Sequence, residues 1–318
     1  MNLAENNAMK IAFLNLCHTD PDIVARTAAK LTENENFDMY VHVDDKSDIK
    51  LFKSALSDIK GVYFTQERVK VYWGGFNAIR ATIALLRQAI AAPRKYDYFV
   101  ILQNLDYPIK SNEYIENFFG KHNGKQFIRG CPIAETKDWH YSRKYKIYNS
   151  RDDDFYLKKH GKCRLYMRYA NMLIKSLKTI LGNGIICDGG KDYRLYYGAA
   201  QWAVTRELAQ YLVGFYDSHQ GFNKYMQHVQ FPDEEYFHTI VHNSDYKYEC
   251  HMYDEPERRW LVNWRNLHYF EYPKEIKVVT EADFDKIMVE DALFVRKVRS
   301  GVSDALLDKI DVATRMQV

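Results

Sequence analysis

A regular alternation of strand-like and helix-like segments in the first part of the chain is the feature that most constrains its fold. Short apolar runs at residues 10–16, 38–44 and 97–103 alternate with segments of helical period, such as 21–33. This alternation predicts an α/β protein with a Rossmann-like, mostly parallel sheet covered by helices on both faces. Because ligands bind such sheets at the carboxyl ends of the strands, we expect the functional residues at that edge.

The rest of the chain continues this pattern less regularly. Residues 135–165 are rich in charge and aromatics with weak periodicity, which predicts a long functional loop, and Gly182–Gly190 predicts a flexible connection. Further strands are expected at 61–65 and 200–205, and further helices at 48–59, from Gly74-Gly75 onward, from Ser111 to Phe119, at 164–181, from Arg206 to Ser218, from Asp233 to Ile240 and, as the final helix, from about Glu281.

The composition excludes several classes of protein. The chain has 318 residues and a net charge of +3, with no strongly basic stripe, so we expect no nucleic-acid partner. No apolar run reaches the roughly 18 residues of a membrane span, and the N-terminus does not resemble a secretory signal. The five scattered cysteines include no CxxC pair and predict reduced thiols. We therefore expect a cytoplasmic protein, and a peripheral position at a membrane stays open.

Polar residues follow three of the expected strands and are candidates for ligand binding. His18 and Asp44 come directly after the first two strands, and Gln103–Asp106 follow the strand at 97–103. An acid in the position of Asp44 can accept hydrogen bonds from a ribose or a base. For Asp45 and Asp48, capping of the next helix is an equally good interpretation. Neither a GxGxxG fingerprint nor a P-loop is present.

Two stretches bear on anion and metal binding. Gly74-Gly75 open a helix, so free backbone amides there can face a ligand, or the glycines can simply allow close packing. Asp106 is the single acid of Gln103–Asp106, and one carboxylate makes a poor cation site, so we expect no metal ion. The run Asp152-Asp153-Asp154 is interpreted as a solvated turn.

Near the C-terminal end, an acidic and a basic stretch form a complementary pair. Pro232 is followed by Asp233, Glu234 and Glu235, which indicates either a proton acceptor or a well-capped helix N-terminus. Arg296, Lys297 and Arg299 form a basic cluster, and we interpret Arg299 as an ordinary surface residue. Two cations near one point can neutralise a pyrophosphate without a metal ion.

Together these stretches resemble the core-2/I-branching β-1,6-N-acetylglucosaminyltransferase family, which also includes peptide O-xylosyltransferases. The resemblance runs from about Lys10 to Lys297 and is weakest over 135–190. It lies in the order and spacing of six motifs: VHVDDKSD, WGGFNAIRAT, DYFVILQNLDYPIKSN, YGAAQWAVTRE, PDEEYFHTIV and LFVRK. Without the membrane anchor and disulfides of animal members, the chain looks like a soluble, bacterial-type relative.

The resemblance implies a GT-A fold and a metal-independent, inverting transferase that uses a UDP-sugar and needs no cofactor. It implies one domain over 1–318, with a nucleotide-binding half at about 9–130, a charged insertion at about 131–190 and an acceptor and catalytic half at about 191–318. The family's catalytic base falls on Glu234 and its phosphate-binding Lys on Lys297. The family's second phosphate-binding Arg is replaced by His268, so Arg265, His268 or Arg296 is expected to take that place.

Several roles stay open at this point. Glu235 is the rival base, although one residue along a helix turns a side chain by about 100°. Trp202 and Gln201 are candidate sugar contacts, with a core position equally possible for Trp202, and Asp106 is either structural or near the sugar.

The expected reaction moves a sugar, preferentially GlcNAc, from UDP to a glycan or lipid-linked glycan hydroxyl in surface polysaccharide or glycoconjugate synthesis. Residues 135–165 are expected to determine acceptor choice. The alternatives are a UDP-xylose or other UDP-sugar transferase and a non-catalytic glycan- or nucleotide-binding protein.

Overall fold

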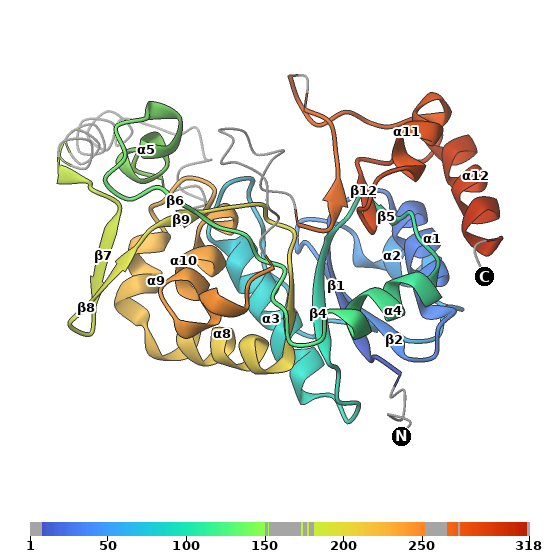
Figure 1. The fold of residues 1–318 in the computed structure, drawn as a ribbon, viewed down its shortest axis with the longest axis horizontal. Coiled ribbons are helices and arrows are strands. Elements are labelled where there is room, and N and C mark those ends of the chain that lie inside the picture. The colour runs from blue at the N-terminus through green and yellow to red at the C-terminus, as the bar shows by residue number, and fades with distance from the viewer. Residues whose placement is uncertain are drawn as a thin grey trace.

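A five-stranded sheet lies at the centre of the fold (Figure 1). The structure is a computed structural model that describes residues 8–149, 152, 173, 177, 181–251, 266–272 and 274–316. The strand order β10-β4-β1-β2-β3 joins β1 (Ile11–Cys17), β2 (Phe37–Val43), β3 (Val62–Phe64), β4 (Tyr98–Gln103) and β10 (Ala203–Thr205). β1 is parallel to both β2 and β4, β2 is parallel to β3, and β10 is antiparallel to β4. The predicted mostly parallel sheet is confirmed.

Helices pack on both faces of this sheet because its strands are apolar on both sides. In β1, Leu14 packs into one hydrophobic cluster and Phe13 into another. The cluster around Leu14 includes α3 (Asn77–Ala91), α8 (Arg206–Ser218), α9 (Gln220–Met226) and α10 (Tyr236–His242). The cluster around Phe13 includes α1 (Pro21–Thr32), α2 (Ile49–Ala55) and α4 (Asn112–Lys121). Each fully buried Leu or Phe contributes about 1.5–3 kcal/mol to folding.

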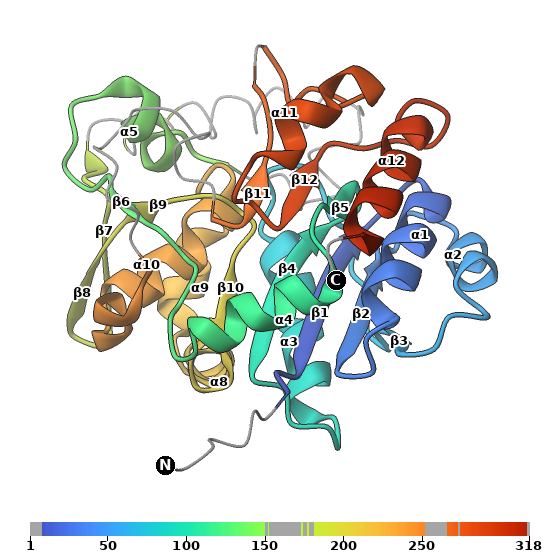
Figure 2. The same ribbon diagram turned by 45° about the vertical axis from the view of Figure 1, so that its right-hand side comes forward.

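A second, three-stranded sheet brings the C-terminal part of the chain to the carboxyl edge of the main sheet (Figure 2). Its order is β11 (His268–Tyr269), β12 (Phe294–Arg296) and β5 (Asp106–Pro108), and β5 follows β4 directly in the chain. β12 is antiparallel to β5, with Arg296 opposite Asp106. η4 (Glu281–Asp283) and α11 (Phe284–Met288) lie between β11 and β12 in the chain, and α12 (Asp304–Arg315) follows β12.

Several local predictions are wrong. The stretch 135–165, expected to be a long loop, contains the helix α5 (Trp139–Lys146). Pro232–Glu234 form a 3₁₀ turn, η1, and the helix α10 begins only at Tyr236. Gly182–Gly190 are not a flexible connection, because they lead into a hairpin of β7 (Ile185–Asp188) and β8 (Lys191–Arg194). Its turn is Gly189-Gly190, and both have a positive φ, as a two-residue hairpin turn requires. The helix expected near Glu281 is not the final one, because α12 follows it.

The remaining described elements flank the main body. They are β6 (Cys131–Pro132) paired with β9 (Tyr196–Tyr197), α5 (Trp139–Lys146) and η2 (Asp245–Glu249). The helix predicted at 164–181 lies almost entirely outside the described residues. No helix in the described parts of the chain is long and apolar enough to cross a membrane.

Asp152 caps the long helix α3 from outside it. Its Oδ2 atom accepts a hydrogen bond from the backbone amide of Asn77 at 2.9 Å. From the sequence, one interpretation is that free amides at this helix N-terminus bind a ligand. The carboxylate of Asp152 occupies that position instead. A Cβ atom added to Gly75 would lie 2.1 Å from Oδ1 of Asp152, so the glycine is needed for this approach. The prediction that Asp152 lies in a solvated turn is wrong, because it is partly buried against α3.

We predict that Gly75→Ala lowers the free energy of unfolding by about 1 kcal/mol, because the new methyl group displaces the capping carboxylate. In an Asp152→Ala background the same substitution is expected to cost less. Gly214→Ala, within α8 and with no neighbour within 4 Å of the added atom, should instead stabilise by about 1 kcal/mol. Urea denaturation measures all of these; equal losses from Gly75→Ala in both backgrounds would contradict the cap.

Candidate functional site

Charged residues from separate strands meet at the carboxyl edge of the main sheet. His18 follows β1 and is exposed. Desolvation lowers the pKa of its imidazole, Asp44 opposes this, and the positive charges of Lys46, Arg296 and Lys297 lower it further. These charges therefore act on one imidazole, although they come from the two ends of the chain. The edge combines His18 and Asp44 with the basic stretch at Arg296 and Lys297.

Asp44 is buried and organises the turn after β2. Its Oδ1 atom accepts hydrogen bonds from the backbone amides of Lys46, at 2.9 Å, and Val71, at 3.3 Å. The ammonium of Lys46 lies 3.4 Å from Oδ2. The side chain of Asp48 accepts the amide of Lys50, so Asp48 is the cap of α2. A role for Asp44 in binding a ribose or base stays a prediction.

Asp106 is 1 % exposed and forms the centre of a buried ionic cluster. Its Oδ1 atom accepts a hydrogen bond from Nη1 of Arg296 at 2.7 Å, and its Oδ2 atom accepts the amide of Gln103 at 2.7 Å. Nε2 of His268 lies 3.2 Å from Oδ2. Burial alone would raise the pKa of Asp106, but Arg296, His268 and the amide outweigh it and hold this pKa below its ordinary value. Both carboxylate oxygens are thus already engaged by protein groups.

This cluster changes the expected roles of two basic residues. His268 is 2 % exposed and stacks on Phe294, so it is buried rather than placed to contact a phosphate. The side chain of Arg296 is 15 % exposed and shares its charge with Asp106. Arg265 lies outside the described residues. Across the described parts of the chain, no three His, Cys, Asp or Glu side chains converge as metal ligands.

Lys297 is a cation of this edge whose charge is not paired with another described residue and can bind an anion. It follows Arg296 at the end of β12 and is half-buried. Desolvation and the neighbouring charges of Arg296 and Arg299 lower its pKa. Within the described residues its ammonium forms no hydrogen bond or ion pair. An anion at this point would therefore relieve the repulsion among three cations.

The acidic turn η1 presents one carboxylate and buries another. The carboxylate of Glu234 pairs with the ammonium of Lys144, and its side chain is 20 % exposed. Glu235 is completely buried, with Oε1 3.1 Å from the same ammonium. Burial raises the pKa of Glu235 well above its ordinary value, although Lys144 opposes this. Of these two candidate bases, Glu234 is therefore the one that reaches solvent.

The acidic turn lies within electrostatic reach of the basic strand. Burial, together with the charge of Glu234, raises the pKa of Asp233 to about 7, while the charges of Lys144 and Arg296 lower it. The same Arg296 precedes Lys297 in the chain. The structure therefore brings the turn that carries Glu234 near the strand that leads to Lys297, although 63 positions separate these two residues in the sequence.

The other two candidate sugar contacts belong to the interior. Trp202 is 1 % exposed and packs on Phe237 with ring centroids 4.9 Å apart, so the core interpretation is correct. Gln201 is buried and donates a hydrogen bond to Oε1 of Gln103 at 3.0 Å. Gln201 is thus hydrogen-bonded to the last residue of β4.

Sequence reasoning missed Lys144. It lies on α5 in the charged insertion, 90 positions before Glu234, and its side chain is 5 % exposed. One arginine, Arg143, and one further lysine, Lys146, within α5 offer the same sequence signal. No sequence signal singles out Lys144, because only the structure shows that Glu235 is buried and therefore needs a nearby cation.

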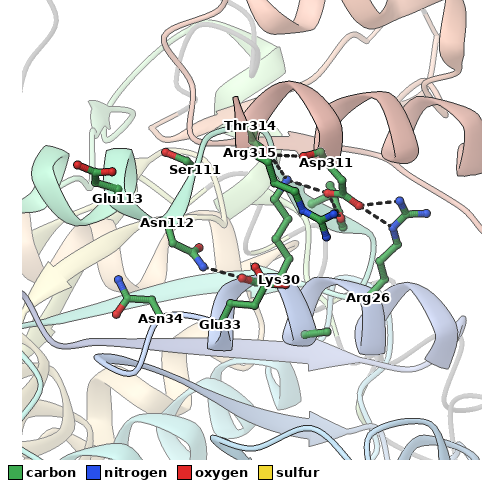
Figure 3. Close-up of a pocket in the computed structure, with 12 residues that line it drawn as sticks. Arg26, Lys30, Glu33, Asn34, Ser111, Asn112, Glu113, Asp311, Thr314 and Arg315 are labelled. Carbon is green, nitrogen blue, oxygen red and sulfur yellow. Dashed lines mark hydrogen bonds and ion pairs between the residues drawn. The ribbon is translucent and has the colours of Figure 1, made fainter. Parts of the chain in front are cut away.

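A cavity of about 440 Å³ lies apart from these groups, between α1, α12 and the start of α4 (Figure 3). Its cations Arg26 and Lys30 both bind Asp311, at 2.7 Å and 2.9 Å. None of its lining residues is a candidate from the sequence. The cavity therefore does not compete with the carboxyl edge as the candidate site.

A sequence profile of the Core-2/I-Branching enzyme family matches residues 11–288. The chain belongs to this family. The match includes Asp106 and Glu234 and ends shortly before Lys297. A mostly parallel α/β sheet with helices on both faces is the GT-A-like architecture of Core-2/I-branching enzymes.

Curated relatives carry xylosyltransferase names. The chain is 24% identical to human xylosyltransferase 2 over 74% of its length, and 22% identical to a xylosyltransferase of Ciona intestinalis over 80%. It is 21% identical to xylosyltransferase oxt of Drosophila pseudoobscura pseudoobscura over 71%. The aligned parts are 25%, 27% and 23% of these relatives, so this chain of the Core-2/I-branching family spans about a quarter of their length.

We predict that Asp106→Asn in this Core-2/I-branching chain lowers the free energy of unfolding by about 3–5 kcal/mol, because it leaves the Arg296 guanidinium without its buried partner. The pKa of Asp106 is lower in the folded protein than in the unfolded chain. The difference in free energy of unfolding between the wild type and the variant is therefore complete above the unfolded pKa of about 4. It shrinks as the pH falls through the folded value. Denaturation at several pH values measures the difference.

Asp308→Asn is the matched control for this prediction. Asp308 pairs with Arg26 but is 72% exposed, so its loss should cost less than about 1 kcal/mol. Equal costs for the two substitutions would contradict the central place of the Asp106 cluster.

Proposed function

We propose that this chain is a metal-independent, inverting glycosyltransferase that moves a sugar from a UDP-sugar to a hydroxyl of a glycan. One observation carries the proposal: the solvent-accessible carboxylate of Glu234 and the unpaired ammonium of Lys297 belong to one region of the described structure. A base and an anion-binding cation facing one ligand are the minimum set for direct displacement of a nucleotide by an alcohol.

Glu234 acts on the acceptor side of the reaction. A sugar hydroxyl is a weak nucleophile that must lose its proton as it attacks the anomeric carbon. An ionised carboxylate on the acceptor side accepts this proton, and such general-base help is typically worth about 10²–10⁴-fold. A single attack from the face opposite UDP inverts the configuration at the anomeric carbon.

Lys297 and Arg296 act on the side of the departing nucleotide. Negative charge accumulates on the diphosphate as the bond to the sugar breaks, and fixed cations stabilise that charge. The oxygens of Asp106 are engaged by Arg296, His268 and the Gln103 amide, so they are not open to a divalent cation. This arrangement supports a reaction in which side-chain cations take the part of a metal ion.

The donor sugar divides the proposal into two versions. GlcNAc follows from the branching members of the family, and the names of the curated relatives favour xylose equally. A role in surface polysaccharide or lipid-linked glycan synthesis belongs to the same proposal. UDP release from a panel of nucleotide sugars, measured with and without EDTA, tests it. Release that needs a divalent cation would refute the metal-free version, and no release from any donor would favour a binding protein.

We predict that Glu234→Gln retains UDP binding but lowers turnover by about 10²–10⁴-fold, because the amide cannot accept the acceptor proton. Calorimetry with UDP and a UDP-release assay separate the two effects. If the variant kept full turnover, Glu234 would not be the base; if it lost UDP binding as well, its role would lie in donor binding.

We predict that Lys297→Gln weakens UDP binding by about 10–100-fold, since a hydrogen bond to a charged group is worth about 1.5–3 kcal/mol. The affinity of the wild type, measured by calorimetry, should fall with added salt more steeply than that of the variant. Arg299→Gln is the control, because Arg299 is an exposed neighbour of the same charge. Equal losses in both variants would indicate a general field rather than a specific phosphate contact.

A further inference from the structure

A buried lysine joins the charged insertion to the acidic turn. Lys144 projects from α5, and its side chain is 5 % exposed. Its ammonium contacts the carboxylate of Glu234 and lies 3.1 Å from Oε1 of Glu235. One cation thus bridges the carboxylate that reaches solvent and the carboxylate that does not.

The ammonium is fixed by more than these two ion pairs. It lies 4.3 Å from the ring centroid of Tyr197, a cation–π distance. The backbone carbonyl of Lys144 accepts a hydrogen bond from the amide of Gln230 at 3.1 Å, close to the start of the acidic turn. Both ends of the residue are therefore anchored to the segment that carries Glu234, which restricts the positions open to the carboxylate.

Charges from several elements surround Glu234. Asp233 and Glu235 lie on its own turn, and Lys144 and His140 on α5 interact with it. From β9 the phenol of Tyr197 faces it, and from β12 the charge of Arg296 reaches Asp233. Burial would lower the pKa of Lys144, but the two glutamates outweigh this and raise it, so the ammonium stays charged. Lys144 is the cation in contact with both glutamates.

We propose that Lys144 is a positioning residue for the catalytic base: its ammonium, held against Glu235 and Tyr197, orients the Glu234 carboxylate and offsets the negative charge of the acidic turn. The inference rests on the proposed function, in which Glu234 accepts the acceptor proton. It gives the insertion a part in the chemistry beyond the choice of acceptor. Lys144 itself need not touch a substrate.

The main test is the pH dependence of kcat/KM for UDP release with the donor found by the screen. Removing a cation that contacts a carboxylate favours the protonated carboxyl. In Lys144→Met the acid limb of the profile should therefore move to higher pH by about one unit or more, and the maximal rate should fall because the carboxylate is less well oriented. In Lys144→Arg the acid limb should lie close to its pH in the wild type, because the positive charge is retained. An unmoved limb in Lys144→Met would overturn the proposal.

Arg143→Met is the matched control. Arg143 is exposed on the same helix, one residue from Lys144, so its profile should coincide with that of the wild type. If both variants moved the limb equally, the effect would be a general loss of positive charge, and the positioning role would be rejected.

A second measurement does not need turnover. Difference infrared spectra between the wild type and Glu234→Gln report the titration of this one carboxyl, and the same pair is compared in a Lys144→Met background. A midpoint that rises in that background supports the bridge even if no donor reacts, in which case the proposed function alone fails. An unchanged midpoint overturns the bridge. If Lys144→Met does not fold, Lys144→Met combined with Glu235→Gln removes the cation together with its buried partner and serves in both assays.

Discussion

The ion pair between Asp106 and Arg296 is the contact on which the arrangement of this protein depends. It joins β5, which follows the interior strand β4, to β12 near the C-terminus, and the two residues are directly opposite in the strand register. A buried charge pair of this kind adds little net stability but is costly to break. Its effect is therefore to fix position. It places the basic stretch at the carboxyl edge of the main sheet. His18, which follows β1, and Asp44, which follows β2, lie at the same edge.

The same pair separates the tasks of the two neighbouring cations. Arg296 is held by Asp106 and supplies a fixed, partly neutralised charge, whereas Lys297 keeps an available ammonium. On the other side of the region, Lys144 stands between Glu234 and Glu235. Each side thus contains a buried pairing that holds an accessible group in place. In the proposed reaction, these pairings keep the carboxylate of Glu234 and the ammonium of Lys297 in one region without forming an ion pair with each other.

Much of the scaffold could be predicted from sequence, because it depends on local periodicity. The run at 97–103 is almost entirely apolar and forms the interior strand β4, and the helix from Arg206 to Ser218 has the predicted ends. Where two local structures share one signal, prediction failed. Pro232 followed by acids suits a 3₁₀ turn as well as a helix start, and Gly189-Gly190 suits a tight hairpin as well as a flexible segment.

The candidate site could be predicted only in part, for a related reason. Glu234 and Lys297 stand in motifs whose order is recognisable, whereas Lys144 and Asp152 lie in a segment without periodicity. Their partners, Glu234 and Asn77, are 90 and 75 positions away, and only the folded chain reveals such pairings. The role of Trp202 and the choice among Arg265, His268 and Arg296 stayed open because burial cannot be read from residue type alone.

The capping of α3 by Asp152 has a consequence for the modularity of this enzyme family. A charged insertion in a conserved type of fold is commonly regarded as a replaceable segment. Here it carries both the carboxylate that terminates a main-body helix and the lysine that braces the acidic turn. Transplanting the corresponding segment from a homologue would remove a scaffold contact and a neighbour of the proposed base in a single exchange, so altered selectivity and a weakened framework would be inherited together.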